Sequence, residues 1–324
     1  MKNQIKKLKP LTIIILLPLF IGCSTAKSSS MAHLTMKNDY CISNITSDFT
    51  EIKSSFNNPD SLFAGNKDLN THFTKNEIIV ANAVGSIAIL QKLISNLNDT
   101  SADAKLNNIA LRQQLLEQTF RVKSVFDELN SEINCESERT KRAATYLDGY
   151  EKKRTTNLTI AAILTGSATS IAPLVIKDNK SQNAATIIGA VASAYLGAKL
   201  LYSGNKKVKF TYDRNLLSDV WNEPKISTQY PEFIWLLMNL KELNTGSMEL
   251  SMQQNIKNRW LNIELNGTNE KTLDLIFKKG GDYTEDDLQT RAILLNQLEA
   301  SMRLLNSNIQ SYLSSIQRKL ERKN

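Results

Sequence analysis

Three cysteines and two histidines are the residues of this 324-residue chain that are best suited to nucleophilic or metal chemistry. The histidines, His33 and His72, have no further His or Cys at metal-ligand spacing. No CxxC, GxSxG or HExxH pattern surrounds any of these residues. We therefore expect no enzyme, no catalytic residue, no metal, no cofactor and no small-molecule substrate. The chemistry left to Cys23, Cys41 and Cys135 is covalent attachment or cross-linking.

Cys23 follows a segment that is typical of an export signal. Four lysines and no acid come first, and the apolar run 11–22 is then shorter than the roughly 20 residues of a membrane-spanning helix. The run ends in Phe20-Ile21-Gly22-Cys23, and small polar residues follow. This ending resembles the lipobox of bacterial lipoproteins, although Phe20 stands where an aliphatic residue is usual. The resemblance implies that residues 1–22 are removed and that Cys23 carries lipid, including palmitate.

The same resemblance implies a location in the cell envelope. Ser24 stands where an aspartate usually retains lipoproteins at the inner membrane, so we expect a lipid-anchored protein of the outer membrane. Two alternatives remain. One is ordinary signal cleavage near Ser24–Ala26, and the other is an uncleaved anchor, which Pro18 and the short apolar run disfavour. The resemblance covers only these first residues, and no sequence motif in the rest of the chain identifies a domain family.

The charge balance gives little reason to expect a polyanionic partner. The formal net charge is +8, and loss of the four lysines of the signal lowers it to +4. Charged residues are otherwise well mixed along the chain. We expect no nucleic-acid partner.

Cys41 and Cys135 remain once Cys23 is assigned to lipid. An even pair of cysteines in an exported protein predicts a disulfide. Closing a loop of this size would stabilise the fold by roughly 4 kcal/mol in the chain-entropy model. Two free buried thiols are the alternative.

Long stretches of the chain have the periodicity of amphipathic helices, in about 76–97, 101–152 and 284–324. The apolar positions of the second stretch are Leu111, Leu115, Val122, Phe126, Leu129 and Ile133. The third begins at Thr284-Glu-Asp-Asp287, which is typical of a capping box. Its heptad positions are Leu288, Leu295, Met302, Ile309 and Ile316, together with Leu298, Leu305 and Tyr312. Such a seam packs on another long helix as in a coiled coil, within the chain or between copies, and we favour packing within the chain.

Two apolar segments, 158–176 and 184–202, are joined by a short polar loop and flanked by basic clusters. Each has a small residue at every fourth position, which places these residues on one helix face and allows two backbones to approach closely. The positions are Ala162, Gly166 and Ser170 in the first segment, and Ala185, Gly189, Ser193 and Gly197 in the second. The pattern predicts an antiparallel helical hairpin of the glycine-zipper type.

The sequence does not distinguish whether a membrane, the core of the protein or a partner protein surrounds this hairpin. Each segment is close to the length that crosses a bilayer core, so the hairpin is interpreted as membrane-associating. Burial inside a large helical domain is one alternative, because helices that are apolar all round also occur in cores. Cover by a partner protein is another.

The segment 206–283 is the mixed part of the chain. Polar and apolar residues alternate over 207–212, which is typical of an exposed strand. Short helices are predicted near 216–221 and from Pro231. Three tryptophans in this segment predict a compact core, and Lys278–Gly281 is predicted to be a turn that ends a helix.

We therefore predict a mainly α protein, an elongated helical bundle with heptad-patterned long helices. Its parts are a signal peptide (1–22), a tether (23–40), a helical region (41–154), the hairpin (155–205), a small mixed subdomain (206–283) and a long C-terminal helix (284–324).

The predicted function is that of a lipid-anchored helical scaffold or binding component of an envelope or surface assembly, with a protein partner or a second copy of the chain. A membrane-inserting oligomeric or pore-forming lipoprotein is the first alternative, because long helices around an apolar hairpin are similar to the helical-bundle pore-forming toxins. The second is a surface-exclusion lipoprotein, because a lipid anchor combined with glycine-zipper segments resembles that family.

Overall fold

The structure, a computed structural model, describes residue 41 and residues 58–175, 178–202, 206–243 and 249–321. The predicted signal peptide, Cys23 and the tether 23–40 lie outside these residues.

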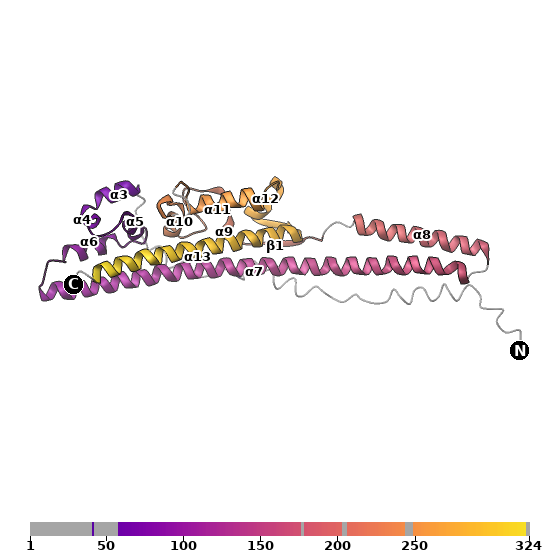
Figure 1. Ribbon diagram of the computed structural model, residues 1–324, viewed down its shortest axis with the longest axis horizontal. Coiled ribbons are helices and arrows are strands. Elements are labelled where there is room, and N and C mark those ends of the chain that lie inside the picture. The colour runs from indigo at the N-terminus through magenta and orange to yellow at the C-terminus, as the bar shows by residue number, and fades with distance from the viewer. Residues whose placement is uncertain (1–40, 42–57, 176–177, 203–205, 244–248, 322–324) are drawn as a thin grey trace, which may run out of the picture. The chain divides into compact units, whose positions relative to one another are not determined.

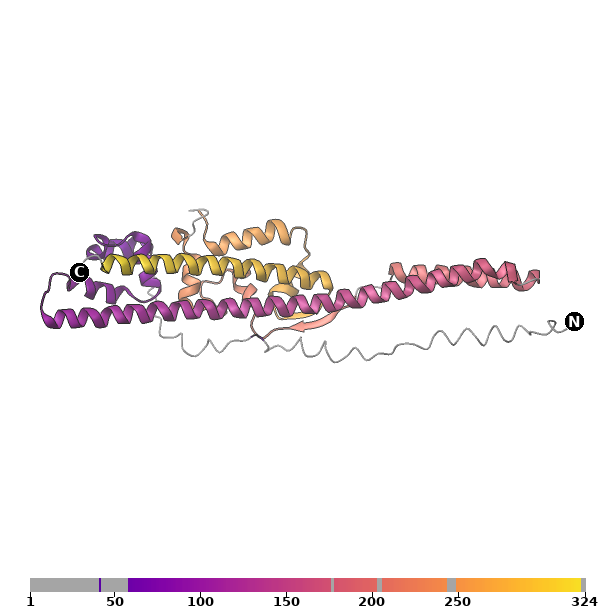
Figure 2. The same ribbon diagram turned by 60° about the horizontal axis from the view of Figure 1, so that its bottom comes forward.

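Two long helices form the framework of the fold, α7 (Ala102–Val175) and α13 (Glu285–Glu321). They pack side by side in opposite directions (Figures 1 and 2). Ser137 in the middle of α7 donates a hydrogen bond to Asn296 near the start of α13 at 2.6 Å. Arg112 near the start of α7 donates to the Leu320 carbonyl oxygen at the end of α13, at 2.9 Å. The prediction of a mainly α helical bundle is confirmed.

The predicted heptad seam lies between these two helices. All eight of its residues in α13 are buried except Tyr312, which is half-buried against the core. The six apolar positions predicted in 101–152 are buried as well. The seam is therefore an interface within the chain, as we favoured from the sequence.

The start of α13 has the predicted capping box, with Asp in place of the usual Glu or Gln. The Thr284 backbone N–H donates to Asp287 Oδ2 at 3.0 Å, and the Asp287 backbone N–H donates to Thr284 Oγ1 at 3.2 Å. These bonds satisfy two of the backbone donors that every helix N-terminus leaves free.

Between residue 58 and α7 the structure has four short helices: α3 (Pro59–Gly65), α4 (Lys67–Asn70), α5 (Lys75–Ala83) and α6 (Ile87–Ser95). The periodicity predicted one helix over about 76–97, and the structure has two. They separate at Gly85, whose φ of 74° lies in the left-handed region that favours glycine.

Helix α5 is held against the end of α13 by an ion pair between Glu77 and Lys319 at 2.6 Å. Burial of the Glu77 carboxyl raises its pKa, but hydrogen bonds from Lys319, the Thr74 backbone and Ser315 outweigh burial and hold the pKa below its usual value. The ionised form is therefore favoured in the fold, and its contribution to stability is lost as the pH falls through this lowered pKa.

The mixed subdomain contains a two-stranded antiparallel sheet and several short helices. Strand β1 (Val208–Thr211) pairs with β2 (Gly280–Tyr283), with Val208 opposite Tyr283. Between them lie α9 (Leu216–Asn222), α10 (Glu232–Asn239), η3 (Lys241–Leu243), α11 (Met252–Arg259), η4 (Trp260–Glu264) and α12 (Glu270–Phe277).

Strand β1 and the helices at 216–222 and 232–239 follow the predictions, but β2 was missed. Lys278 does end α12, but Gly280 and Gly281 continue as the strand instead of a turn. Gly280 has a φ of 80°, and a Cβ there would collide with the Phe210 carbonyl oxygen of β1. Glycine is thus required by the close approach of the two strands.

The three tryptophans lie in the core of this subdomain, as predicted. Trp235 and Trp260 are buried, and the half-buried Trp221 stacks on Phe277 with ring centroids 4.3 Å apart.

The sequence suggested a helix that ends near Lys152 and a separate hairpin arm that begins at Leu158. The structure instead has one helix of 74 residues, α7, which passes through the predicted boundary at 154/155. Residues 153–157 include neither Gly nor Pro, so nothing in their backbone chemistry ends the helix. At 1.5 Å per residue, α7 is about 110 Å long, twice the length of α13.

The α7–α13 seam predicts a sharp contrast between two adjacent leucines of α13. Leu305 is fully buried, whereas Leu304 is 52% exposed. We expect Leu305→Ala to lower the free energy of unfolding by about 2–5 kcal/mol, because it leaves a cavity between the two long helices. Leu304→Ala is the control and should change it by less than about 0.5 kcal/mol. Urea denaturation followed by circular dichroism measures both, and equal effects would contradict the placement of the seam.

Candidate functional site

The second half of α7 and helix α8 (Asn179–Tyr202) form the predicted hairpin, side by side in both views (Figures 1 and 2). The two helices are in close contact at Gly189 of α8. A Cβ at this position would collide with the Thr169 hydroxyl of α7. The absence of a side chain at Gly189 is what allows the two backbones to come together there.

The other predicted small residues lie in different surroundings. Ala185, Ser193 and Gly197 of α8 share the half-buried face with Gly189. On α7, Ala162 and Gly166 are half-buried, whereas Ser170 is exposed. A Cβ built at Gly166 or Gly197 meets no atom within 4 Å, so these two glycines leave open space. The structure brings Gly189 to Thr169, a partner that the small-residue pattern did not identify.

Most of the large apolar side chains that the structure describes in the hairpin are exposed. Eight of them are between 50% and 69% exposed: Ile160, Ile163, Leu164, Ile171, Ile187, Ile188, Val191 and Tyr195. Among the hairpin side chains that the structure describes, in 155–171 and 178–200, none is buried. The hairpin therefore exposes eight large apolar side chains, whereas Gly189 and Thr169 meet in its interface. Leu158, Leu196 and Leu200 are half-buried.

This arrangement is the reverse of that in a water-surrounded protein, in which burial of large apolar side chains drives folding. Small residues inside and large apolar residues outside are typical of helix pairs that face lipid or another apolar surface. An exposed apolar region of this kind marks an interaction surface. We refer to the eight exposed residues as the hairpin surface, and this surface is the candidate functional site.

At the base of the hairpin, Lys206, which follows α8, contacts residues of α7. Its backbone N–H donates to Glu151 Oε1 of α7 at 2.9 Å. Its ammonium lies 3.7 Å from the centroid of the Tyr150 ring, within the range of a cation–π interaction. The two arms of the hairpin are thus joined again at the point where the chain enters the mixed subdomain.

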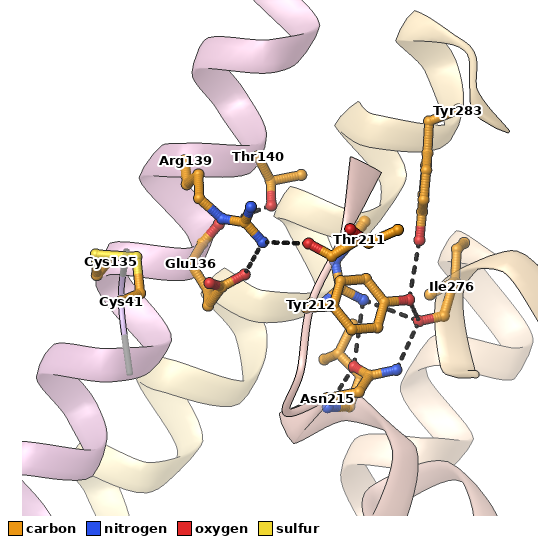
Figure 3. Close-up of polar contacts among 12 residues, drawn as sticks. Cys41, Cys135, Glu136, Arg139, Thr140, Thr211, Tyr212, Asn215, Ile276 and Tyr283 are labelled. Carbon is orange, nitrogen blue, oxygen red and sulfur yellow. Dashed lines mark hydrogen bonds and ion pairs between the residues drawn. A yellow bond between two sulfur atoms is a disulfide. The ribbon is translucent and has the colours of Figure 1, made fainter. Parts of the chain in front are cut away.

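Strand β1, which begins two residues later, is held to α7 by the buried Arg139 (Figure 3). Arg139 donates hydrogen bonds to Glu136 at 3.0 Å and to the Thr211 carbonyl oxygen at 3.2 Å. Its guanidinium also lies 4.1 Å from the centroid of the Phe210 ring. A charge buried this deeply is tolerated because it is paired with a carboxylate and hydrogen-bonded.

A second buried arginine, Arg291 of α13, fixes the other side of the sheet. It donates to the Ile276 carbonyl oxygen at 2.8 Å and lies 3.9 Å from the centroid of the Tyr212 ring. The Tyr212 hydroxyl in turn donates to the carbonyl oxygens of Leu275 and Ile276 in the last turn of α12 and lies 3.1 Å from the Tyr283 hydroxyl (Figure 3). Sequence reasoning missed both arginines. The only available signal was that each is a charged residue within an apolar helical pattern.

Cys41 and Cys135 form the predicted disulfide, with their Cα atoms 5.5 Å apart. Cys135 precedes Glu136 of the Arg139 cluster, so the bridge joins Cys41 to α7 beside the support of the hairpin (Figure 3).

Comparison with models of protein families, with curated proteins and with solved structures gives no match. No helix among the described residues has both the length and the apolar content to span a membrane. The described part of the chain also contains no group of three or more His, Cys, Asp or Glu residues that could hold a metal ion.

The unequal surroundings of the hairpin glycines predict unequal effects of the same substitution. Gly189→Leu should separate α8 from α7, because its side chain would occupy the position of the Thr169 hydroxyl. We expect backbone amides of α8 to exchange hydrogen about tenfold faster or more, while those of α13 are unchanged. Gly166→Leu is the control and should leave α8 exchange near its original rate, because its side chain enters open space. Equal acceleration by both substitutions would contradict this packing.

Proposed function

We propose that this protein is a lipid-anchored helical scaffold or binding component of an envelope or surface assembly, whose hairpin docks on a lipid bilayer. The observation that carries the proposal is the reversed hairpin, with eight large apolar side chains outward and small residues inward. In water such a surface costs free energy, and an apolar surrounding removes this cost. The outer membrane and a lipid on Cys23 are part of the proposal, on the strength of the resemblance to a lipobox.

Chain length supports the engagement of one bilayer by both lipid and hairpin. The 18 residues from Cys23 to Cys41 can span at most about 60 Å. The rise of α7 from Cys135, the disulfide partner of Cys41, to Val175 is also about 60 Å. A lipid at Cys23 can therefore reach the level of the end of the hairpin when the segment from Cys23 to Cys41 is almost fully extended.

Charge supports a lipid surface over a purely apolar protein partner. Basic residues flank the hairpin surface at its base, where Lys152, Lys153 and Arg154 precede it and Lys206, Lys207 and Lys209 follow it. Lys180 stands near the loop. Cations at the ends of an apolar segment interact with anionic head groups while the apolar part contacts the acyl chains.

A pore-forming or otherwise oligomeric membrane protein is the second candidate. It is favoured by Gly166 and Gly197, which leave open space on the hairpin where another helix could approach closely. A surface-exclusion lipoprotein is the third candidate, supported by the combination of a lipid anchor with glycine-zipper segments.

If Cys23 carries the lipid, the Cys23→Ser protein should no longer incorporate a lipid label. Cys41→Ser is the control and should still incorporate it. Cells that express the full chain would be grown with radioactive palmitate, and the protein would be recovered by immunoprecipitation. Label on the Cys23→Ser variant, or on neither protein, would contradict the anchor.

Hairpin docking predicts that the mature protein without lipid, residues 24–324, floats with vesicles of phosphatidylethanolamine and phosphatidylglycerol. Ile163→Glu combined with Ile188→Glu should abolish flotation, because each places a charge in the hairpin surface. Ile226→Glu, at a 77% exposed position outside the hairpin, is the control and should float as before. Failure of the unsubstituted protein to float would overturn docking and leave the lipid anchor as a separate question. Release of an entrapped dye would favour the pore.

A further inference from the structure

A second exposed apolar surface lies on α7, in the part of the helix that precedes Cys135. Four of its side chains are between 46% and 67% exposed: Leu106, Ile109, Leu116 and Phe120. With Gln113 in the middle, they follow alternating steps of three and four residues, which places them in one row along the helix. We call these four residues and Gln113 the α7 stripe.

The α7 stripe lies on the far side of the helix from the core. The residues that α7 buries in this region, Leu111, Leu115 and Val122, are each two positions from a stripe residue and so lie about 200° around the helix. Contacts with the preceding helices also use other positions, because Gln118 donates to the Val84 carbonyl oxygen at 2.6 Å. The stripe is therefore an apolar face on the outside of the bundle.

The stripe has the spacing of a coiled-coil seam with charges of opposite sign along its two edges. If Leu106, Gln113 and Phe120 are a positions, Lys105 and Arg112 fall at g positions. Glu117 falls at an e position on the other edge. Arg112 is held in place by its hydrogen bond to Leu320, and both Lys105 and Glu117 are exposed.

This charge pattern distinguishes between the two orientations of a helix pair. In a parallel pair, each g position faces the e position of the following heptad in the partner, so Arg112 of each copy meets Glu117 of the other. In an antiparallel pair g positions face one another, and the basic edges of both copies would meet. Complementary charge thus favours two parallel copies of this chain.

We propose that the α7 stripe is a self-association surface on which two copies of the chain pair in parallel. The stripe is small compared with the roughly 1,200 Å² that a stable interface buries, so the pairing is weak in solution. Anchorage of both copies in one membrane raises their effective concentration and also orients them in parallel. The contacts of the pair include neither Cys23 nor the hairpin surface. Only the gain from anchorage rests on the function proposed above, and the pairing itself is tested below without lipid.

Cysteine cross-linking tests this pairing with the mature protein without lipid, residues 24–324, in which the only native thiols form the Cys41–Cys135 bridge. Under mild oxidation, Gln113→Cys should give a covalent dimer, because this residue lies in the centre of the seam. Ala102→Cys, at the start of α7, should also give one in a parallel pair but not in an antiparallel pair centred on Gln113. Asn107→Cys, an exposed position on another face of α7, is the control and should stay monomeric.

Charged substitutions in the stripe supply the second test. Leu116→Lys combined with Phe120→Lys, in the Gln113→Cys protein, should lower the rate of dimer formation by about tenfold or more. Leu304→Lys, at an isolated exposed leucine of α13, should leave the rate unchanged. Monomeric Gln113→Cys, equal cross-linking at Asn107, or no effect of the stripe substitutions would overturn the proposal. A dimer from Gln113→Cys but not from Ala102→Cys would overturn the parallel orientation.

Discussion

The packing of α13 along α7 is the interaction on which the other parts of the structure depend. A lone helix as long as α7 would bury none of its apolar residues, and most helical stability in proteins comes from tertiary packing. The seam buries one face of α7 from Leu111 to the region of Ser137 and Asn296. The short N-terminal helices and the mixed subdomain then pack on this pair. Because α7 continues past the start of α13 without a break, the stability of the seam also holds the first arm of the hairpin.

The hairpin and the seam follow opposite rules of packing. In the seam, large apolar residues meet and are buried. In the hairpin, Gly189 meets Thr169, and the eight large apolar residues of the hairpin surface are exposed. A helix pair packed by small residues gains little from the hydrophobic effect and relies on close backbone contact. The two halves of one helix are therefore suited to different surroundings, and this difference is the basis of the function that we propose.

The support of the hairpin is polar and lies at its base. Lys206 joins the exit of α8 to α7, and Arg139 and Arg291 fix the small sheet between α7 and α13. Buried arginines with several acceptors restrict geometry more than apolar contacts do, because each hydrogen bond has a preferred direction. The disulfide joins Cys41 to α7 next to this cluster. These contacts together support the base of the hairpin.

Much of the fold could be read from the sequence, because apolar periodicity reports the buried face of a helix whatever it packs against. The heptads of α13 and strand β1 were predicted in this way. The capping box was predicted from its motif, the pairing of Cys41 with Cys135 from the even number of cysteines left after Cys23, and the hairpin from two apolar segments with small residues at every fourth position. Strand β2 was not, because Gly280 and Gly281 carry no apolar alternation and depend on their neighbour β1.

For the candidate site, the sequence by itself determined that two apolar segments with small residues form a hairpin. Only the tertiary structure decided that Gly189 packs against Thr169, that Gly166 and Gly197 face open space and that the large side chains point outward. It also decided that the first arm is continuous with the core helix and that Arg139 and Arg291 are buried supports. The physical reason is that periodicity gives the direction of a side chain around its own helix. Its partner depends on the rotation and offset of two elements that are distant in the chain.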